Sequence, residues 1–520
     1  MNAKTSKDSL YVILGILLVF LFQATAARDG HDWGGDYSQY ILHAQQLVQG
    51  QPYADLGYVY SAKNPVGPRA YPPGFPIVLV PALYLFDLNF VALKVTVALF
   101  FALALWAYWH IARTHLPRWW ALGSLAFLAL SPRMLKFSNN VLSDVPFLAL
   151  TLVSIYAIYH FLKSPPQFRN ALLAMLAITL ACGFQPRALA LIGALGLFVL
   201  LFQRTHLLYS IGIAATALIS ASAIYHIAGS GGGTYIEHLS FHPIDLYNNF
   251  SRNIFAYKRG LLRYLSLYPS RNEQTLHFML INNGILLLFV GFFVRGLMYN
   301  IKNKGVQYYD VFIATYLAII LLYRWNQSIR YLFPIIPILI LHAFVGIRLT
   351  FAFILRHAKW PKRLRLTHRL RPFAPAGVYT PLFLMYWVYF AFFPTSPGAN
   401  ILLEPNTSGL FQTVREHKAE MSGIIFSHPR VMKLFTGART AVCYNTFEVH
   451  WDIEHLLKFA HTNEISHIAV GPNNYIFRPI VSQNPQHFQT IYQNDVFAIH
   501  RIIPKSMRAP IAATDHHTKQ

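Results

Sequence analysis

Long runs of apolar residues alternate with short polar segments along most of the chain. Runs suited to membrane spans of about 17–25 residues lie near residues 10–27, 88–112, 118–133, 142–162, 170–186, 188–203, 207–228, 278–298, 310–323, 332–355 and 376–394. This pattern predicts an α-helical polytopic membrane protein with about eleven transmembrane helices. The first run is interpreted as an uncleaved span, because the small-residue cleavage pattern of a signal peptide is weak there.

Two polar segments, 28–87 and 229–277, are longer than a connection between spans requires. Apolar residues at helical spacing from Tyr37 to Val48 predict a short amphipathic helix, with Asp36 at its N-cap. Residues 244–268 mix apolar and basic side chains as a helix in the membrane interface does. Both segments are therefore expected to carry function.

The pattern changes after residue 394. "SGIIFS", "ISHIAVGP" and "DVFAIHRI" predict short strands, and "FQTVREHKAEM" and "DIEHLLKFAHT" predict helices between them. We therefore expect a transmembrane domain over 1–394, with outward loops 28–87 and 229–277, and a small C-terminal α/β domain over 395–520.

Composition supports the membrane interpretation, because 55% of the 520 residues are hydrophobic and only 12% are charged. The 43 lysines and arginines exceed the 20 acidic residues, but they occur in short clusters between apolar runs, which indicates topology signals and no nucleic-acid partner. The basic cluster from Arg356 to Arg371 is expected in the cytoplasm. Counting spans from it places the N-terminus in the cytoplasm and both long loops and the C-terminal domain outside.

The polar residues expected at the outer face combine few carboxylates with many cations. The carboxylates of interest are Asp36 and Asp144, and the cations include Lys63, Arg69, Arg187, Lys258, Arg259 and Arg330. Such a set could hold an anionic group while one carboxylate acts as a base. The alternatives are structural: Asp36 and Asp144 as helix N-caps, and Arg187 and Arg330 as lipid anchors. No P-loop, glycine-rich dinucleotide fingerprint or metal-ligand spacing is present.

Several segments, in order, resemble the GT-C type membrane glycosyltransferases, which include protein O-mannosyltransferases and the lipid A aminoarabinose transferase. The segments are "GGDYSQYILHAQQLVQGQPY", "YPPGFPIVLVPALYLF", "SPRMLKFSNNVLSDVPFLALTLVSIYAIYHF", "GFQPRALALIGAL" and "IRYLFPIIPIL". The resemblance covers roughly the first 340 residues, and the α/β tail is similar to tails of bacterial members.

The resemblance implies inverting transfer of a sugar from a polyprenyl-phosphate carrier to a hydroxyl or phosphate of a lipid, glycan or protein acceptor on the outer membrane face. It implies that Asp36 is the general base, that Asp144 is a second acidic residue of the site, and that Arg187 and Arg330 meet the donor phosphate. No cofactor is assigned, and a divalent metal ion stays open: the family often has two adjacent acids where this chain has Asp36 and Tyr37. The tail favours a bacterial inner membrane with a periplasmic site.

Two other classes of function stay open. A transporter or flippase of a polyprenyl-linked or other anionic substrate would also need cations and carboxylates. No inverted repeat or pair of broken helices is visible, and the charged residues lie on one expected side instead of at the midplane. A receptor-like scaffold would leave Asp36 with no role beyond a cap.

Overall fold

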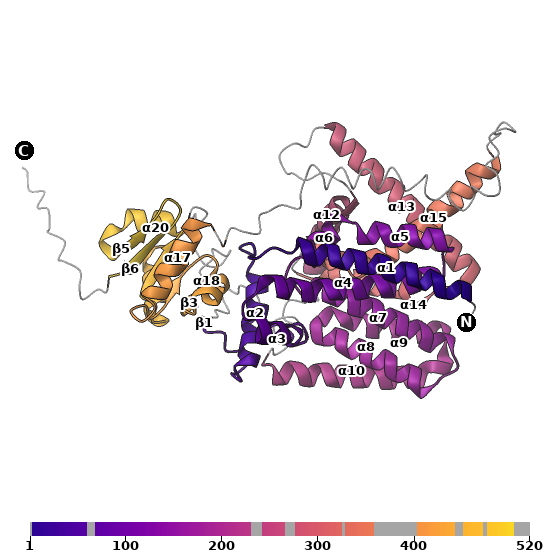
Figure 1. Ribbon diagram of the computed structural model, residues 1–520, viewed down its shortest axis with the longest axis horizontal. Helices are drawn as coiled ribbons and strands as arrows, with labels where there is room; N and C mark the ends of the chain where they lie inside the picture. Colours follow the sequence, from indigo (N-terminus) through magenta and orange to yellow (C-terminus); the bar gives the residue numbers. More distant parts are fainter. Residues whose placement is uncertain are drawn as a thin grey trace, which may run out of the picture. The chain divides into compact units, whose positions relative to one another are not determined.

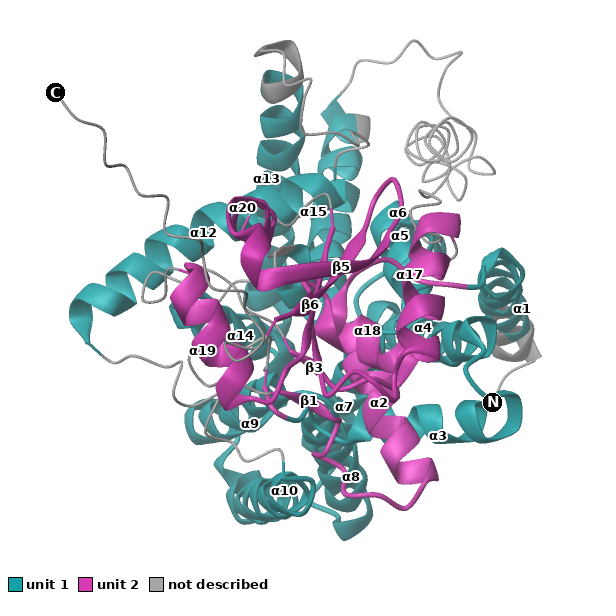
Figure 2. Ribbon diagram, turned by 90° about the vertical axis from the view of Figure 1, so that its left-hand side faces the viewer, with its two compact units in different colours: residues 1–29, 70–397 teal, residues 30–69, 398–520 magenta. Residues whose placement is uncertain are grey.

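The computed structural model describes residues 3–59, 68–229, 242–265, 276–324, 328–357, 402, 404–441, 451–471 and 476–503. The chain forms two compact units. Unit 1 comprises Met1–Asp29 and Ala70–Pro397, and unit 2 comprises Gly30–Arg69 and Gly398–Gln520 (Figure 2).

Unit 1 is α-helical. Its α-helices are α1 (Ala3–Ala26), α3 (Gly74–Phe86), α4 (Phe90–Arg113), α5 (Arg118–Ala129), α6 (Pro132–Ser138), α7 (Asp144–Lys163), α8 (Phe168–Phe184), α9 (Leu189–Phe202), α10 (Leu207–Ile227), α12 (Pro243–Leu265), α13 (Leu276–Lys304), α14 (Tyr308–Leu322) and α15 (Ile336–His357). Short 3₁₀ turns, η1 (Pro186–Ala188), η2 (Arg204–His206) and η3 (Ser328–Leu332), lie in three of the connections. The helices α7, α8 and α10 run side by side (Figure 1).

The chain is a polytopic helical protein, as its hydropathy pattern predicts. Every span predicted before residue 356 coincides with a helix, and the run 376–394 lies outside the described residues. Among the described helices, five are long and apolar enough to cross a membrane. Unit 1 also contains shorter apolar helices. One of them is α3, in a segment for which the sequence pattern predicts an outward loop.

Helix α12 is the amphipathic helix predicted within 244–268, and it is fixed to the end of α14. The amide of Asn253 donates to the carbonyls of Leu321 and Tyr323, at 3.0 and 2.6 Å. The last carbonyls of a helix have no partner within the helix, so this amide serves as their cap. Gly260 lies against the backbone of Ile329 in η3, where an added Cβ would be 3.2 Å from the amide nitrogen.

Unit 2 is an α/β domain. Its helices are α2 (Gly35–Val48), α17 (Pro405–Glu416), α18 (Pro429–Thr436), α19 (Ile453–Thr462) and α20 (Phe477–Gln483), and its strands are β1 (Tyr58–Val59), β2 (Ile424–Ile425), β3 (Thr440–Ala441), β4 (His467–Val470), β5 (Phe488–Gln493) and β6 (Ala498–Ile502). The sheet order is β1-β3-β2-β4-β6-β5. Strands β1, β3, β2 and β4 are parallel, β6 is antiparallel to β4, and β5 is antiparallel to β6. Ile425, Ile468 and Phe477 belong to its apolar core.

The segment 30–69 folds with the C-terminal domain, whereas the sequence pattern suggested a loop of the transmembrane domain. Strand β1 pairs with β3, with Tyr58 opposite Thr440, and α2 packs against α18. Trp33 stacks on His428 at 5.0 Å and contacts Phe426 and Phe497. Both the sheet edge and this aromatic cluster come from distant parts of the chain, so only tertiary structure reveals the association. In Figure 2, α2 and β1 share the colour of β3 and α18.

Candidate active site

Asp144 lies between two arginines in unit 1. Its carboxylate accepts hydrogen bonds from Arg330, at 2.9 Å from Nε and 2.8 Å from Nη2, and an Nη of Arg187 lies 3.6 Å from its other oxygen. The side chain of Asp144 is only 2% exposed, compared with 11% for Arg187 and 21% for Arg330. One carboxylate and two guanidinium groups leave one net positive charge in a poorly hydrated place, which favours an anionic ligand.

Aromatic side chains fix the orientation of Arg187. Its guanidinium lies 3.9 Å from the ring centre of Tyr331, and it donates to the hydroxyl of Tyr316 at 3.2 Å. Tyr257 of α12 lies close enough to Arg187 for its hydroxyl to feel the charge of the guanidinium. This buried hydroxyl has no hydrogen-bond partner among the described residues. A buried hydroxyl without a partner is costly, so a ligand oxygen at this place would satisfy it.

Asp144 is not the N-cap that the sequence suggested. Ser143 occupies the N-cap of α7 and Asp144 is the first helical residue, so its side chain turns to the arginines instead of to its own helix. The side-chain amide of Gln185 donates to the hydroxyl of Ser143 and joins the start of α7 to the turn that carries Arg187. The three predicted residues Asp144, Arg187 and Arg330 therefore meet in one cluster.

Asp36 pairs with an arginine of the C-terminal segment in unit 2. The Nη2 atom of Arg430, in α18, lies 3.5 Å from a carboxylate oxygen of Asp36. Arg430 is 5% exposed and Asp36 is 30% exposed, so the carboxylate is accessible to solvent while its partner is enclosed. A half-accessible carboxylate held by a buried cation can accept a proton from a molecule that reaches it.

Gln39, one helical turn after Asp36, connects Arg430 to the backbone at Pro68. Its side-chain carbonyl accepts from Arg430 Nη1 at 2.5 Å, and its amide donates to the carbonyl of Pro68 at 2.9 Å. Gly35 makes this packing possible, because an added Cβ would lie 2.6 Å from Arg430 Nη2. Gly35 thus allows close approach of a buried guanidinium to α2.

The predicted N-cap role of Asp36 is wrong. Gly34 occupies that position without a side-chain bond, and Asp36 lies in the first turn, where its charge favours the positive end of the helix. Sequence analysis also missed Arg430, since "PRVMKLFT" appears as an ordinary amphipathic helix and only the tertiary packing of α18 on α2 connects the two residues.

The other predicted phosphate-binding residues are more scattered. Lys258 and Arg259 are exposed on α12, and neither makes a hydrogen bond or ion pair with a described residue. Arg69 is exposed in unit 2, where its backbone carbonyl accepts from Gln39. Lys63 lies outside the described residues.

A divalent metal does not fit the surroundings of Asp36 as the structure describes them. The guanidinium of Arg430 lies 3.5 Å from its carboxylate and would repel a second cation there. Within the described ranges, no three His, Cys, Asp or Glu side chains gather as a ligand set.

The chain is similar to known membrane glycosyltransferases. Residues 70–227 match the family model described as dolichyl-phosphate-mannose-protein mannosyltransferase. The fold matches ArnT from Cupriavidus metallidurans in the apo state, with a TM-score of 0.55 and 13% identity over 96% of this chain and 99% of that one. It also matches the same protein bound to undecaprenyl phosphate, with a TM-score of 0.51 and 14% identity over 96% and 98%.

A third similar structure is the oligosaccharyltransferase AglB from Archaeoglobus fulgidus in complex with an inhibitory peptide and a dolichol-phosphate. The TM-score is 0.59 and the identity 11%, over 92% of this chain and 72% of that one. Among curated proteins, none matches this chain significantly by sequence. Residues 70–227 thus carry the sequence pattern of the mannosyltransferase model, and the chain as a whole has a fold similar to those of ArnT and AglB.

Proposed function

We propose that this protein is an inverting glycosyltransferase that moves a sugar from a polyprenyl-phosphate carrier to an acceptor hydroxyl or phosphate. The observation that carries the proposal is the buried cluster of Asp144, Arg187 and Arg330, whose net positive charge suits a lipid-linked phosphate. The ligands named for two proteins of the same fold, undecaprenyl phosphate and dolichol-phosphate, support this class of donor.

The leaving group is the phosphate of the carrier. When the bond between the sugar carbon and the phosphate oxygen breaks, its electron pair passes to that oxygen, and the phosphate gains one negative charge. Arg187 and Arg330 stabilise this charge as it develops, because their guanidinium groups are already oriented by Asp144 and Tyr331. Asp144 is a positioning residue in this scheme. Lys258, Arg259, Arg69 and Lys63 are assigned a weaker role in attracting the anionic carrier.

The general base is Asp36. It takes the proton from the acceptor group as the acceptor oxygen attacks the sugar carbon from the face opposite the phosphate, which inverts that carbon. Its 30% exposure leaves the carboxylate open to an incoming acceptor, and Arg430 limits its rotation. This assignment follows the resemblance in the first loop and the accessibility of the side chain.

We further propose that the reaction occurs on the outer face of a bacterial inner membrane and that the acceptor is a lipid, glycan or protein. The basic residues between predicted spans support the orientation, with the N-terminus in the cytoplasm. The AglB structure contains an inhibitory peptide, which supports a protein acceptor, whereas the undecaprenyl phosphate in the ArnT structure supports the carrier.

The test is release of free polyprenyl phosphate from a labelled pool of polyprenyl-phosphate sugars by the purified protein, with a membrane extract as acceptor source. Wild-type protein is expected to release carrier phosphate, and Asp36→Asn is expected to lose this activity while keeping its fold. Asp55→Asn is the matched control, because Asp55 is an exposed carboxylate in the same segment. Full activity in Asp36→Asn would remove the base assignment, and binding without release by the wild type would favour a transporter.

The two charged groups lie in different units, so their cooperation needs a separate test. If Asp36 and Arg330 act on the same donor and acceptor, the double variant Asp36→Asn/Arg330→Gln loses little more activity than the worse single variant. If the activity losses of the two single variants instead multiply in the double variant, Asp36 and Arg330 act independently.

A further inference from the structure

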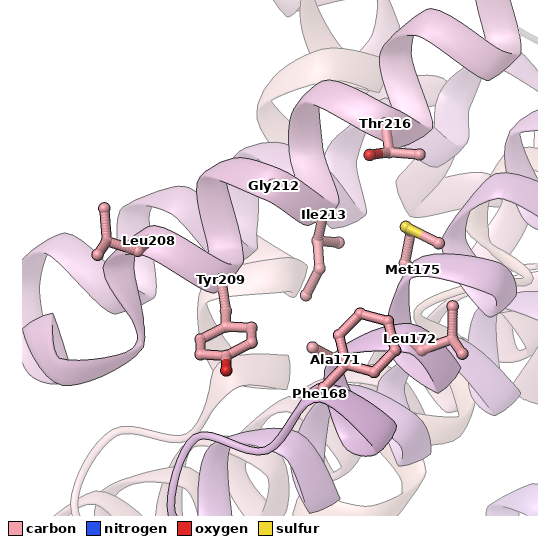
Figure 3. Close-up of a pocket in the computed structure, with 9 residues that line it drawn as sticks. All are labelled: Phe168, Ala171, Leu172, Met175, Leu208, Tyr209, Gly212, Ile213 and Thr216. Atoms are coloured by element: carbon pink, nitrogen blue, oxygen red, sulfur yellow. The ribbon is translucent and has the colours of Figure 1, made fainter.

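An apolar groove lies between the first turns of α8 and α10, away from the candidate active site. Its volume is about 390 Å³, within the size range of sites that hold small molecules. Phe168 and Met175 of α8 and Leu208, Tyr209, Gly212 and Thr216 of α10 contribute to its walls. Figure 3 shows Tyr209 and Ile213 pointing from α10 toward α8. Arg187 follows the opposite end of α8, so this groove is a separate feature.

The groove has the length and the polarity of a lipid chain site. Its wall on α10 extends from Leu208 to Thr216, a rise of about 12 Å at 1.5 Å per residue. The hydrocarbon region of one bilayer leaflet is about 15 Å thick, so the groove could hold much of one acyl chain. Apart from the hydroxyls of Tyr209 and Thr216, the side chains at the groove are apolar (Figure 3).

Three cations lie close in sequence to the residues at one end of the groove. Arg169 follows Phe168 directly, Arg204 lies one helical turn before Leu208, and Lys163 ends α7; all three are exposed. A hydrogen bond of 3.1 Å between His206 Nε2 and the carbonyl of Ser164 joins the connection that carries Lys163 to the turn that carries Arg204. The sequence contains no Asp or Glu between Asp144 and Glu237, so no neighbouring acid in the chain balances these charges.

We propose that this groove binds one acyl chain of an anionic phospholipid, with the phosphate of its headgroup at Arg169 and Arg204. The apolar wall accounts for the chain, and the cations at one end account for a negative headgroup. A zwitterionic lipid would fill the groove equally well but would gain less from the cations. Each basic residue near a membrane surface contributes about fivefold to the affinity for anionic lipid, so the two arginines together account for about 25-fold. The site is independent of the proposed transfer reaction.

The test compares two lipids with identical acyl chains, phosphatidylglycerol and phosphatidylcholine. Delipidated full-length protein in detergent is titrated with each, and the shift of its unfolding temperature reports binding, because a ligand that binds only the folded state raises that temperature. We expect phosphatidylglycerol to act at concentrations at least tenfold lower. Equal potency of the two lipids would overturn the proposal.

Two sets of variants locate the effect. Gly212→Leu is expected to abolish the rise in unfolding temperature that either lipid causes. An added Cβ at Gly212 meets nothing within 4 Å, so the leucine side chain can fill the groove without disturbing the helix. Gly193→Leu on α9 is the matched control, because its Cβ position is equally open and lies outside the groove. Arg169→Gln/Arg204→Gln is expected to reduce the preference for phosphatidylglycerol about 25-fold, with a much smaller change in the response to phosphatidylcholine.

An unchanged phosphatidylglycerol response in Gly212→Leu would contradict the proposal, as would an unchanged preference in the arginine double variant. Undecaprenyl phosphate is added in a third titration. If it displaces phosphatidylglycerol from the wild type and loses its effect in Gly212→Leu, the groove holds the carrier lipid and the phospholipid assignment is wrong. Because the readout is an unfolding temperature, the result does not depend on transferase activity.

Discussion

Each unit contains a carboxylate that is paired with at least one buried or partly buried arginine, and we assign each pair a role in the proposed reaction. In unit 1, Arg330 gives two short contacts to Asp144, while Arg187 stacks on Tyr331. Breaking a buried ion pair by removing one partner typically costs about 3–5 kcal/mol, because the other charge is left uncompensated. The roles of the two arginines can therefore be separated from stability only by substitutions that keep hydrogen-bonding capacity.

Arg330→Gln is expected to lower the transfer rate about 10²–10³-fold, because it removes a charge that stabilises the departing phosphate. It should also weaken the binding of free polyprenyl phosphate, which a displacement titration measures. Arg356→Gln on α15 is the control, since Arg356 is an exposed arginine outside the cluster. An Arg330→Gln enzyme with a normal single-turnover rate would exclude Arg330 from the phosphate site.

Gly35→Ala tests the pairing of Asp36 with Arg430. The new Cβ would lie 2.6 Å from Nη2 and 2.9 Å from Nε of Arg430, so the guanidinium must leave its place beside Asp36 and Gln39. We expect a loss of activity of up to about 10²-fold with little change in stability, as for other displacements of about 1 Å at an active site. In an Arg430→Ala background the same substitution should have almost no further effect. An additive loss in the double variant would rule out this mechanism.

The residues of the site were predictable from the sequence to different degrees. Asp144, Arg187 and Arg330 stood out because charged side chains beside apolar runs are costly, but their convergence depends on packing between distant helices. Both N-cap predictions were wrong, since Gly34 and Ser143 take those positions and free the two carboxylates for ion pairs. Arg430 gave no signal, because nothing in a basic amphipathic helix indicates which acidic residue its tertiary partner will be.

At the scale of elements, α13 and α15 are held together by a glycine at each side of the crossing. An added Cβ at Gly296 would lie 1.8 Å from the carbonyl oxygen of His342, and one at Gly346 would lie 1.9 Å from that of Phe292. Close approach of backbones through small residues is a common way to associate helices in a membrane. The buried side chain of His342 adds a contact of 2.9 Å to Asp310 of α14.

Gly296→Ala is therefore expected to destabilise the folded protein by about 1–3 kcal/mol, because the two helices must move apart. Gly291→Ala in the same helix meets nothing within 4 Å and should be neutral or slightly stabilising, since alanine favours helix more than glycine does. The unfolding temperatures of the two variants in detergent provide the comparison. Equal unfolding temperatures would show that α13 and α15 do not need this close crossing.

Helix α2 is expected to lose stability in acid. Burial lowers the pKa of His43 to about 4, although a hydrogen bond to the carbonyl of Tyr53 opposes the shift. The groups that face its ring include the amide of Gln39, the ring of Tyr53 and the charge of Arg430. Since the unfolded state takes up a proton near pH 6.5 and the folded state only near pH 4, stability is full above pH 6.5 and falls as the pH drops toward 4.

The loss across that window amounts to up to about 3.5 kcal/mol at roughly 1.4 kcal/mol per pKa unit. Hydrogen exchange of the α2 amides, corrected for the intrinsic rate, should show weaker protection at pH 5 than at pH 7. His43→Gln should remove most of this difference, whereas His461→Gln, an exposed position in α19, should retain it. Equal pH dependence in all three proteins would exclude His43 as the titrating group.

The whole molecule combines a helical bundle with an α/β unit that is built from two separated parts of the chain. The sequence predicted both architectures, because hydropathy runs and strand-like alternation are local signals. It did not predict that 30–69 would join the C-terminal unit, because a two-residue strand such as β1 gives no periodicity and its pairing with β3 joins Tyr58 to Thr440, far away in the chain. The association has a topological consequence: the first polar segment and the tail must lie on the same side of the membrane.

Sidedness is testable with single cysteines in a background that lacks Cys182 and Cys443. Ser482→Cys reports on unit 2 and Lys302→Cys on the end of α13, and both positions are exposed. In intact cells a membrane-impermeant maleimide should label Ser482→Cys and spare Lys302→Cys until the membrane is opened, because the basic residues near Lys302 favour the cytoplasm. Labelling of Lys302→Cys alone would reverse the orientation, and it would place Asp36 with the tail in the cytoplasm. The proposed use of a carrier-linked sugar at the outer face would then be wrong.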